Sequence, residues 1–155
     1  MYRETYGVTD DADLLGTVED VVRCLGGGYN AERLLWEIAT VETGRGTIED
    51  RTIGAGMGIC QFDEIGFDDV KARTRSRHRD SINRCFSVDI NDVVWEDLRT
   101  SPLLSLIWCR LKFKLIPDAI PSSISGRGSY WKKFYNTSAG KGSLAHYLDM
   151  NESLA

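Results

Sequence analysis

The segment from Ser101 to Pro117 constrains the fold more than any other part of the chain. Ser101 is a good N-cap and Pro102 suits the first position of a helix, so the sequence predicts a helix from here to about Ile116. Apolar side chains surround this predicted helix on nearly every side: Leu103, Leu104, Leu106, Ile107, Trp108, Leu111, Phe113 and Leu115. Because a helix that is apolar nearly all round is usually buried by its neighbours, we expect it at the centre of the protein.

The rest of the chain also favours helices. In residues 13–25 apolar side chains recur at steps of three and four, and the glycines at 26–28 end this helix because glycine costs backbone entropy. Further helices are expected at 30–43, 64–73, 130–135 and 143–150. Residues 47–61 and 126–128 are expected in loops, and the basic stretch 71–79 as an exposed loop or irregular strand. Since no strong hairpin signal appears, the sequence predicts a mainly α single domain over residues 1–155, with little or no β-sheet.

Composition and charge argue against several classes of protein. Apolar residues make up 42% of the 155 residues, too many for a disordered chain. The net charge of -4 gives no argument for binding nucleic acid or a membrane surface. The run 103–116 is too short and carries too many charges to span a bilayer. No apolar stretch follows the first residues, so we expect no signal peptide.

The cysteines and histidines give no metal-binding pattern. Cys24, Cys60, Cys85 and Cys109 are well separated, and neither of the two histidines lies beside one. This spacing is poor for zinc, so we expect neither a metal nor another cofactor. Two disulfides are an alternative, but a chain of this size does not need them, and we expect free thiols.

Glu42 is the candidate catalytic residue. The predicted helix that begins at Asn30 carries an apolar stripe at steps of three and four: Leu34, Leu35, Ile38 and Val41. Glu42 lies four residues after Ile38 and therefore shares the face of that residue, in the last turn before Gly44. Partial desolvation and the negative end of the helix dipole both raise the pKa of a carboxyl group placed there. A raised pKa is what a general acid needs near neutral pH.

Three segments together carry a family resemblance. They are Val41-Glu-Thr-Gly44, Gly54-Ala-Gly-Met-Gly-Ile-Cys-Gln-Phe62, and Tyr130-Trp-Lys-Lys-Phe-Tyr-Asn-Thr137 with Gly140-Lys-Gly142. In order and spacing they resemble the soluble lytic transglycosylase and goose-type lysozyme group, in particular virion-associated peptidoglycan hydrolases of tailed phages. The resemblance extends from about Asn30 to Leu148. The chain departs from the family pattern at Thr43, where serine is usual, and after the Tyr-Asn pair, where Thr137 and Ser138 precede Ala139-Gly140.

The resemblance implies a lysozyme-like fold and an enzyme that cuts glycan strands of peptidoglycan without a cofactor. A lytic transglycosylase uses one glutamate, here Glu42, first as acid and then as base on the 6-hydroxyl of the sugar, which gives a 1,6-anhydro product. The other residues at motif positions would bind the substrate: Thr43, Met57, Gly58, Gln61, Tyr135 and Asn136. Gln61 would hydrogen-bond the sugars, Tyr135 would orient Glu42 or stabilise developing charge, and Asn136 would hold a loop or an acetamide.

The resemblance also implies a phage setting. The protein would be a virion component, or would stay in the host cytoplasm until release through a holin. It would act on the periplasmic cell wall during lysis or when the phage genome enters the cell. Peptidoglycan is the expected partner, with other virion proteins as further candidates.

Several alternatives remain open at this point. A hydrolytic muramidase on the same fold would need a second carboxylate, for which Asp50, Asp63 and Glu64 are candidates although none occupies a motif position. A virion structural protein could use the fold as an assembly plug. A nucleic-acid-binding module would depend on the basic stretch 71–79 alone.

Overall fold

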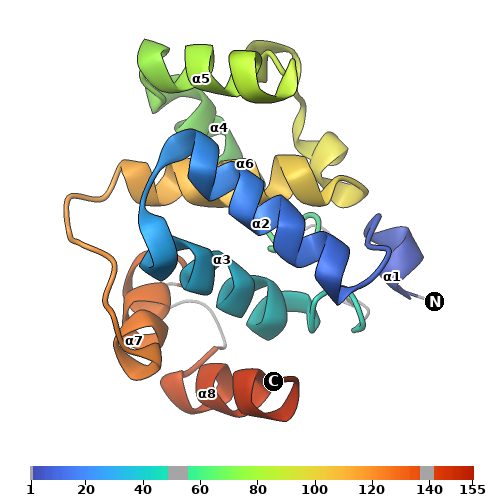
Figure 1. Ribbon diagram of the computed structural model, residues 1–155, viewed down its shortest axis with the longest axis vertical. Coiled ribbons are helices and arrows are strands. Elements are labelled where there is room, and N and C mark those ends of the chain that lie inside the picture. Colours follow the sequence, from blue (N-terminus) through green and yellow to red (C-terminus); the bar gives the residue numbers. More distant parts are fainter. Residues whose placement is uncertain (1, 49–55, 137–141) are drawn as a thin grey trace.

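The computed structural model describes residues 2–48, 56–136 and 142–155. Within them the chain forms α1 (Tyr2–Thr5), α2 (Asp11–Leu25), α3 (Gly28–Thr43), α4 (Glu64–Arg73), α5 (Ser76–Phe86), α6 (Pro102–Lys114), α7 (Ile124–Phe134) and α8 (Leu144–Ser153), with the 3₁₀ helices η1 (Ile90–Asp92) and η2 (Trp95–Arg99) (Figure 1). No strand occurs in the described ranges, where Met57 and Phe62 form an isolated β-bridge. The prediction of a mainly α fold is confirmed.

Helix α6 lies at the centre, as predicted. It passes behind α2 in Figure 1, with α4 and α5 above it and α3, α7 and α8 below. The hydroxyl of Ser101 caps it by accepting a hydrogen bond from the backbone N–H of Leu104 at 3.1 Å. Trp108 is fully buried, stacks on Phe67 with 4.6 Å between ring centroids, and donates to the Phe67 carbonyl at 3.2 Å. None of the helices in the described residues is long and apolar enough to cross a membrane.

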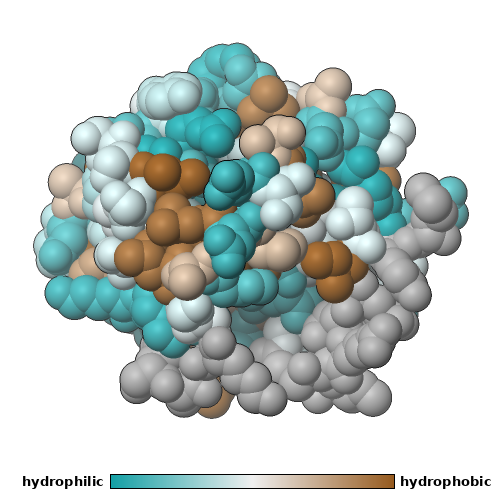
Figure 2. Space-filling view, turned by 90° about the horizontal axis from the view of Figure 1, so that it is seen from below, coloured by the Kyte–Doolittle hydropathy of each residue, from teal (hydrophilic) through white to brown (hydrophobic). Residues whose placement is uncertain are grey.

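The two ends of the molecule carry different surfaces. Helix α5, at the top of Figure 1, holds the second half of the basic stretch. The opposite face, seen from below in Figure 2, shows a hydrophobic patch bordered by hydrophilic residues. Ile124, in the first turn of α7, is among the exposed large hydrophobic side chains of the protein.

Three predictions about local structure were wrong. Residues 76–79 of the basic stretch belong to α5, not to a loop or strand, because Ile82 buries itself completely and anchors that helix. Residues 126–128 belong to α7, where Ser123 caps the helix by accepting from the N–H of Gly126 at 3.0 Å. Cys24 and Cys85 form a disulfide that joins α2 to α5, with 6.3 Å between their Cα atoms. Free thiols are found only at Cys60 and Cys109, and both are buried.

Candidate active site at the end of α3

Helix α3 ends where the sequence predicts. Gly44 has φ 57°, in the left-handed region that glycine adopts without strain. Its N–H donates to the Thr40 carbonyl at 2.8 Å, and the N–H of Arg45 donates to the Ala39 carbonyl at 2.9 Å. These two bonds close the last turn of the helix, so Glu42 has a defined position on it.

Glu42 is half-buried and is held by α7. The indole Nε1 of Trp131 donates to Oε2 of Glu42 at 2.9 Å. Trp131 is itself 1% exposed and packs against the ring of Tyr147 with 5.2 Å between centroids. A buried indole cannot swing away, so it fixes the orientation of the Glu42 carboxyl group.

Thr43 lies inside the protein and joins two of the three segments. Its side chain is 1% exposed, and Oγ1 donates to the carbonyl of Ile59 at 2.8 Å. The same oxygen accepts from the N–H of Gly46 at 3.1 Å. Thr43 therefore positions the glycine-rich segment against the end of α3, although the family resemblance assigned it to the substrate.

Residues 57–62 form a tight turn. Met57 and Phe62 exchange backbone hydrogen bonds of 3.0 and 3.1 Å. Gly58 has φ 77°, and a Cβ atom there would lie 2.2 Å from the carbonyl oxygen of Leu98, so only glycine fits. Gln61, with φ 51°, turns its side chain back so that Nε2 donates to the Gly58 carbonyl at 3.0 Å.

Gln61 and Tyr135 share the wall of a pocket beside this turn. The pocket measures about 40 Å³ and is also lined by Phe62, Asp63, Gly66 and Lys112. The rings of Phe62 and Tyr135 meet edge to face with 5.7 Å between centroids. Two predicted substrate-binding residues from different segments thus lie around one small cavity.

Tyr135 shows that the three segments share one electrostatic environment. Its hydroxyl donates to the carbonyl of Cys60, so it supports the turn, while Trp131 has the contact with Glu42 that was predicted for Tyr135. Burial raises the pKa of Tyr135 well above its usual value, and electrostatic interactions with Cys109, Cys60, Glu42 and Asp63 raise it further. The end of α3, the turn and the end of α7 therefore converge.

Cys60 and Cys109 lie next to one another beneath this site. The pKa of the Cys60 thiol is raised well above its usual value. A hydrogen bond with Cys109 is the largest cause, burial is the next, and the charge of Glu42 adds to the effect. Both thiols are fully buried. They fill the space between α6 and the turn as small apolar groups.

Asn136 follows the C-terminal end of α7 and lies beside Trp131. Its N–H donates to the carbonyl of Trp131 at 2.8 Å, and its Oδ1 accepts from Nζ of Lys132 at 3.1 Å. Gly142 packs against the same place, since a Cβ atom there would lie 2.3 Å from Cη2 of Trp131 and 2.9 Å from Nδ2 of Asn136. Bare backbone at residue 142 thus lets the chain approach the indole that holds Glu42.

The candidates for a second carboxylate differ in their position relative to the site. Asp50 lies outside the described residues. Glu64 is exposed in the first turn of α4. Asp63 caps α4 by accepting from the N–H of Gly66, and it also lines the pocket of Gln61 and Tyr135. Asp63 is therefore the described candidate that borders the site. In the described ranges, no three acidic, histidine or cysteine side chains are grouped so that they could hold a metal ion.

A second carboxylate of α3, Glu37, is fully buried and was not among the residues predicted from the sequence. Its two oxygens accept from Nε and Nη2 of Arg127 at 2.8 and 2.9 Å, and Oε1 also accepts from the Tyr147 hydroxyl at 2.6 Å. The sequence spacing could have predicted this burial, because Glu37 lies three residues after Leu34 and four before Val41, on the apolar stripe itself. The pair locks α7 and α8 onto α3.

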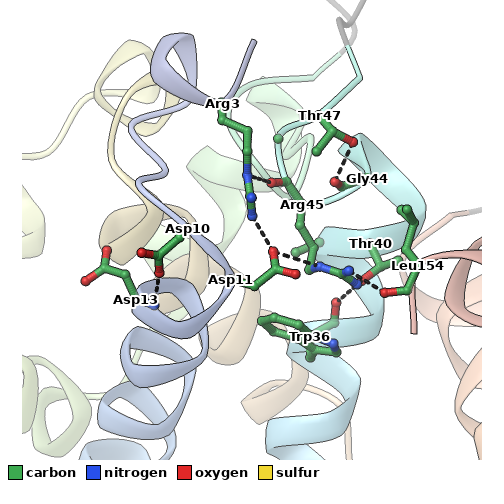
Figure 3. A network of polar contacts seen from close by, with 12 residues as sticks. Arg3, Asp10, Asp11, Asp13, Trp36, Thr40, Gly44, Arg45, Thr47 and Leu154 are labelled. Atoms are coloured by element: carbon green, nitrogen blue, oxygen red, sulfur yellow. Dashed lines mark hydrogen bonds and ion pairs between the residues drawn. The ribbon is translucent and has the colours of Figure 1, made fainter. Parts of the chain in front are cut away.

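Arg45, just after the end of α3, links this end of the helix to neighbouring elements (Figure 3). Its side chain lies over the ring of Trp36, 4.7 Å from the centroid, and donates to Thr40 Oγ1 at 2.9 Å, to Asp11 at 3.3 Å and to the carbonyl of Leu154. Burial alone would raise the pKa of Asp11, but hydrogen bonds from Arg3 and Arg45 hold it below its usual value. The residue just beyond the candidate catalytic turn thus connects α2, α3 and α8.

No protein-family model, curated protein or solved structure matches this chain.

Proposed function

We propose that this protein is a lytic transglycosylase that cuts the β-1,4 bond between N-acetylmuramic acid and N-acetylglucosamine in peptidoglycan, with Glu42 as its catalytic residue. One observation carries the proposal: Glu42 is half-buried at the end of α3 and held by Trp131, among the three segments of the family resemblance. These segments are far apart in the sequence, so their convergence is a property of the fold.

The proposed chemistry needs one carboxyl group in two roles. Glu42 donates its proton to the glycosidic oxygen as the bond from that oxygen to C1 of N-acetylmuramic acid breaks. The 6-hydroxyl oxygen of the same sugar then bonds to C1, and the Glu42 carboxylate takes up the hydroxyl proton. The products are a free 4-hydroxyl and a 1,6-anhydro sugar, no water is consumed, and Glu42 is protonated again.

The surrounding residues take supporting roles in this proposal. Gln61 and Tyr135, which line the pocket, bind sugar hydroxyl or acetamide groups. Met57, Gly58 and Asn136 keep the substrate-binding role that the resemblance implies, while Thr43 and Trp131 position the turn and the Glu42 carboxyl group. The Cys24–Cys85 disulfide supports action outside the cytoplasm, since disulfides persist in oxidising compartments such as the periplasm. Cell lysis and passage of a phage genome into the cell are the two settings that fit a wall-cleaving phage protein.

A hydrolytic muramidase is the second candidate function, and the position of Asp63 favours it. Asp63 shares a pocket with Gln61 and Tyr135, and its charge acts on Tyr135 together with that of Glu42. In a muramidase this carboxylate would activate water or attack the sugar, and the products would carry reducing ends.

The experiment compares wild type with Glu42→Gln on purified sacculi and analyses the released muropeptides by mass spectrometry. Loss of a general acid should lower the rate by a factor of about 10² to 10⁴. Glu64→Gln is the matched control, because Glu64 is an exposed glutamate near the site. Circular dichroism and melting curves of Glu42→Gln establish that the fold is kept.

The products distinguish the candidates. Anhydro ends that persist in Asp63→Asn support the transglycosylase. Reducing ends that disappear in Asp63→Asn support the muramidase. If the wild-type protein is folded but releases no fragments, both proposals fail, and a structural plug in the virion becomes the better explanation.

A further inference from the structure

A second pocket lies at the opposite end of α3 from Glu42. It measures about 350 Å³ and lies between the start of α3, the C-terminal half of α6 and the segment 116–120. Gly27 and Asn30 contribute from the start of α3, and Arg110, Phe113 and Lys114 from α6. In Figure 1 this region is where α6 passes behind the connection from α2 to α3. Residues 28 and 42 are about 21 Å apart along the helix axis, so this pocket is separate from the candidate active site.

Arg110 is the central residue of this pocket. It is only 5% exposed, and its Nε donates to the carbonyl of Gly26 at 2.9 Å. Within the described ranges no carboxylate pairs with it, and its two terminal nitrogens have no hydrogen-bond acceptor. Arginine keeps its charge in proteins, so this side chain presents an uncompensated, nearly buried cation with two donor groups at the pocket wall.

Further positive groups surround it. Lys114 lies one turn after Arg110 on α6 and also lines the pocket. Burial lowers the pKa of Lys114, and the charges of Arg110 and Arg77 lower it further, so these cations act on one another. Asp118, at the rim, is the one acidic residue among those that line the pocket, and it pairs with neither Arg110 nor Lys114 in the described part of the chain.

The same cations act on His78, in the N-terminal half of α5. Burial lowers the pKa of His78, and the charges of Lys114, Arg77, Arg75 and Arg110 lower it further. His78 is half-buried, and an anion bound beside Arg110 and Lys114 would offset the charges that disfavour its protonation. His78 is therefore a natural reporter of what the pocket binds.

The backbone completes the site. The first N–H groups of a helix have no partner inside the helix and carry the positive end of its dipole. Gly27, which precedes α3, has φ 117° and provides no side-chain cap, and the first turn has no acidic residue. A Cβ atom at Gly27 would lie 2.5 Å from Nη2 of Arg110, so the guanidinium lies directly against the start of the helix.

We propose that this pocket binds a phosphate group, held by the guanidinium of Arg110, the ammonium of Lys114 and the backbone N–H groups at the start of α3. A fork-shaped guanidinium, a lysine and a helix N-terminus are the three elements that proteins combine for phosphate oxygens. The pocket has room for more than the free ion, so a phosphate ester is the natural ligand class.

The test uses the only two histidines of the chain, His78 and His146. Inorganic phosphate is titrated into the protein at about pH 6, close to the ordinary pKa of histidine, while sodium chloride keeps the ionic strength constant. Proton NMR then follows the histidine ring signals. The signal of His78 should move towards its protonated position and saturate, whereas that of His146, exposed on α8, should stay in place.

Variants make the test specific. Lys114→Gln should weaken phosphate binding by about tenfold to a hundredfold, the loss expected for a charged hydrogen bond, and Arg110→Gln should abolish saturation. Lys133→Gln, an exposed lysine on α7, should bind like wild type. Arg110 also caps α2, so Lys114→Gln keeps the test valid if Arg110→Gln fails to fold.

A sugar phosphate and acetate complete the titrations. Binding of the sugar phosphate at least as tight as that of free phosphate supports a phosphate ester as the ligand. The proposal is overturned if both histidines respond alike without saturation, if acetate binds as well as phosphate, or if Lys114→Gln binds as wild type does. None of these outcomes bears on Glu42, so failure here leaves the proposed catalytic function untouched.

Discussion

Glu37→Gln should destabilise the protein strongly, although the substitution keeps the size of the side chain. Glu37 is fully buried, and its carboxylate compensates Arg127 through hydrogen bonds of 2.8 and 2.9 Å. The side chain of Arg127 is 6% exposed, and its Nη1 already has no hydrogen-bond partner among the described residues. Removing one member of such a pair leaves a buried charge uncompensated and costs roughly 3–5 kcal/mol. For a domain of this size that loss corresponds to a decrease in melting temperature of about 6–20 °C.

Urea denaturation followed by far-UV circular dichroism measures this change in the free energy of unfolding. Glu19→Gln, an exposed glutamate on α2, is the matched control and should stay within about 0.5 kcal/mol of wild type. Replacing both Glu37 and Arg127 by methionine should be less harmful than Glu37→Gln, because no buried charge is left. A Glu37→Gln protein as stable as the control would refute the reasoning.

Three further predictions concern other links in the fold. Reducing the disulfide between Cys24 and Cys85, which are 61 residues apart, should lower the free energy of unfolding by about 4 kcal/mol, measured by urea denaturation with and without reductant. Thr43→Val leaves the carbonyl of Ile59 without its donor and should cost about 1–3 kcal/mol, while Thr43→Ser should be nearly neutral in the same assay. The pKa of Asp11 is lowered in the folded protein, so its contribution to stability is fully present above its unfolded value of 3.8 and is lost as the pH falls below that value. Melting curves against pH should therefore be flatter in this acid range for Asp11→Asn than for wild type.

Local signals predicted α2, α3, α4, α6 and α8, but they missed α5 and the first half of α7, and they gave no information on long-range partners. Gly44 marks a helix end by its backbone preference and Ser101 marks one by its side-chain hydroxyl, so both ends could be predicted. The basic stretch misled because its charges suggested an exposed loop, while Ile82 anchors a helix and Cys85 pairs with Cys24, 61 residues away. Pairing at such separations leaves no trace in sequence spacing.

The contacts within the site are long-range as well. The motif order led to Glu42 and to the segments that surround it, but not to the contacts between them. Trp131 lies on α7, and Tyr135 follows one turn later as its C-cap. Which of the two reaches Glu42 therefore depends on how α7 is rotated about its axis. The ion pair between Arg127 and Glu37 contributes to that rotation, and it was missed because residues 126–128 were predicted to form a loop.

The hydrogen bonds at the end of α3 can form only late in the synthesis of the chain. Glu42 receives its indole donor from a residue made 89 positions later, and the guanidinium of Arg45 reaches a carbonyl 109 positions away. Contacts over such separations form late, because the intervening chain must be synthesised and folded first. While the chain is still on the ribosome, α3 can be helical, but its final turn has not acquired these partners. A nascent chain that stops before α7 therefore lacks both the indole that holds Glu42 and the carbonyl that accepts from Arg45.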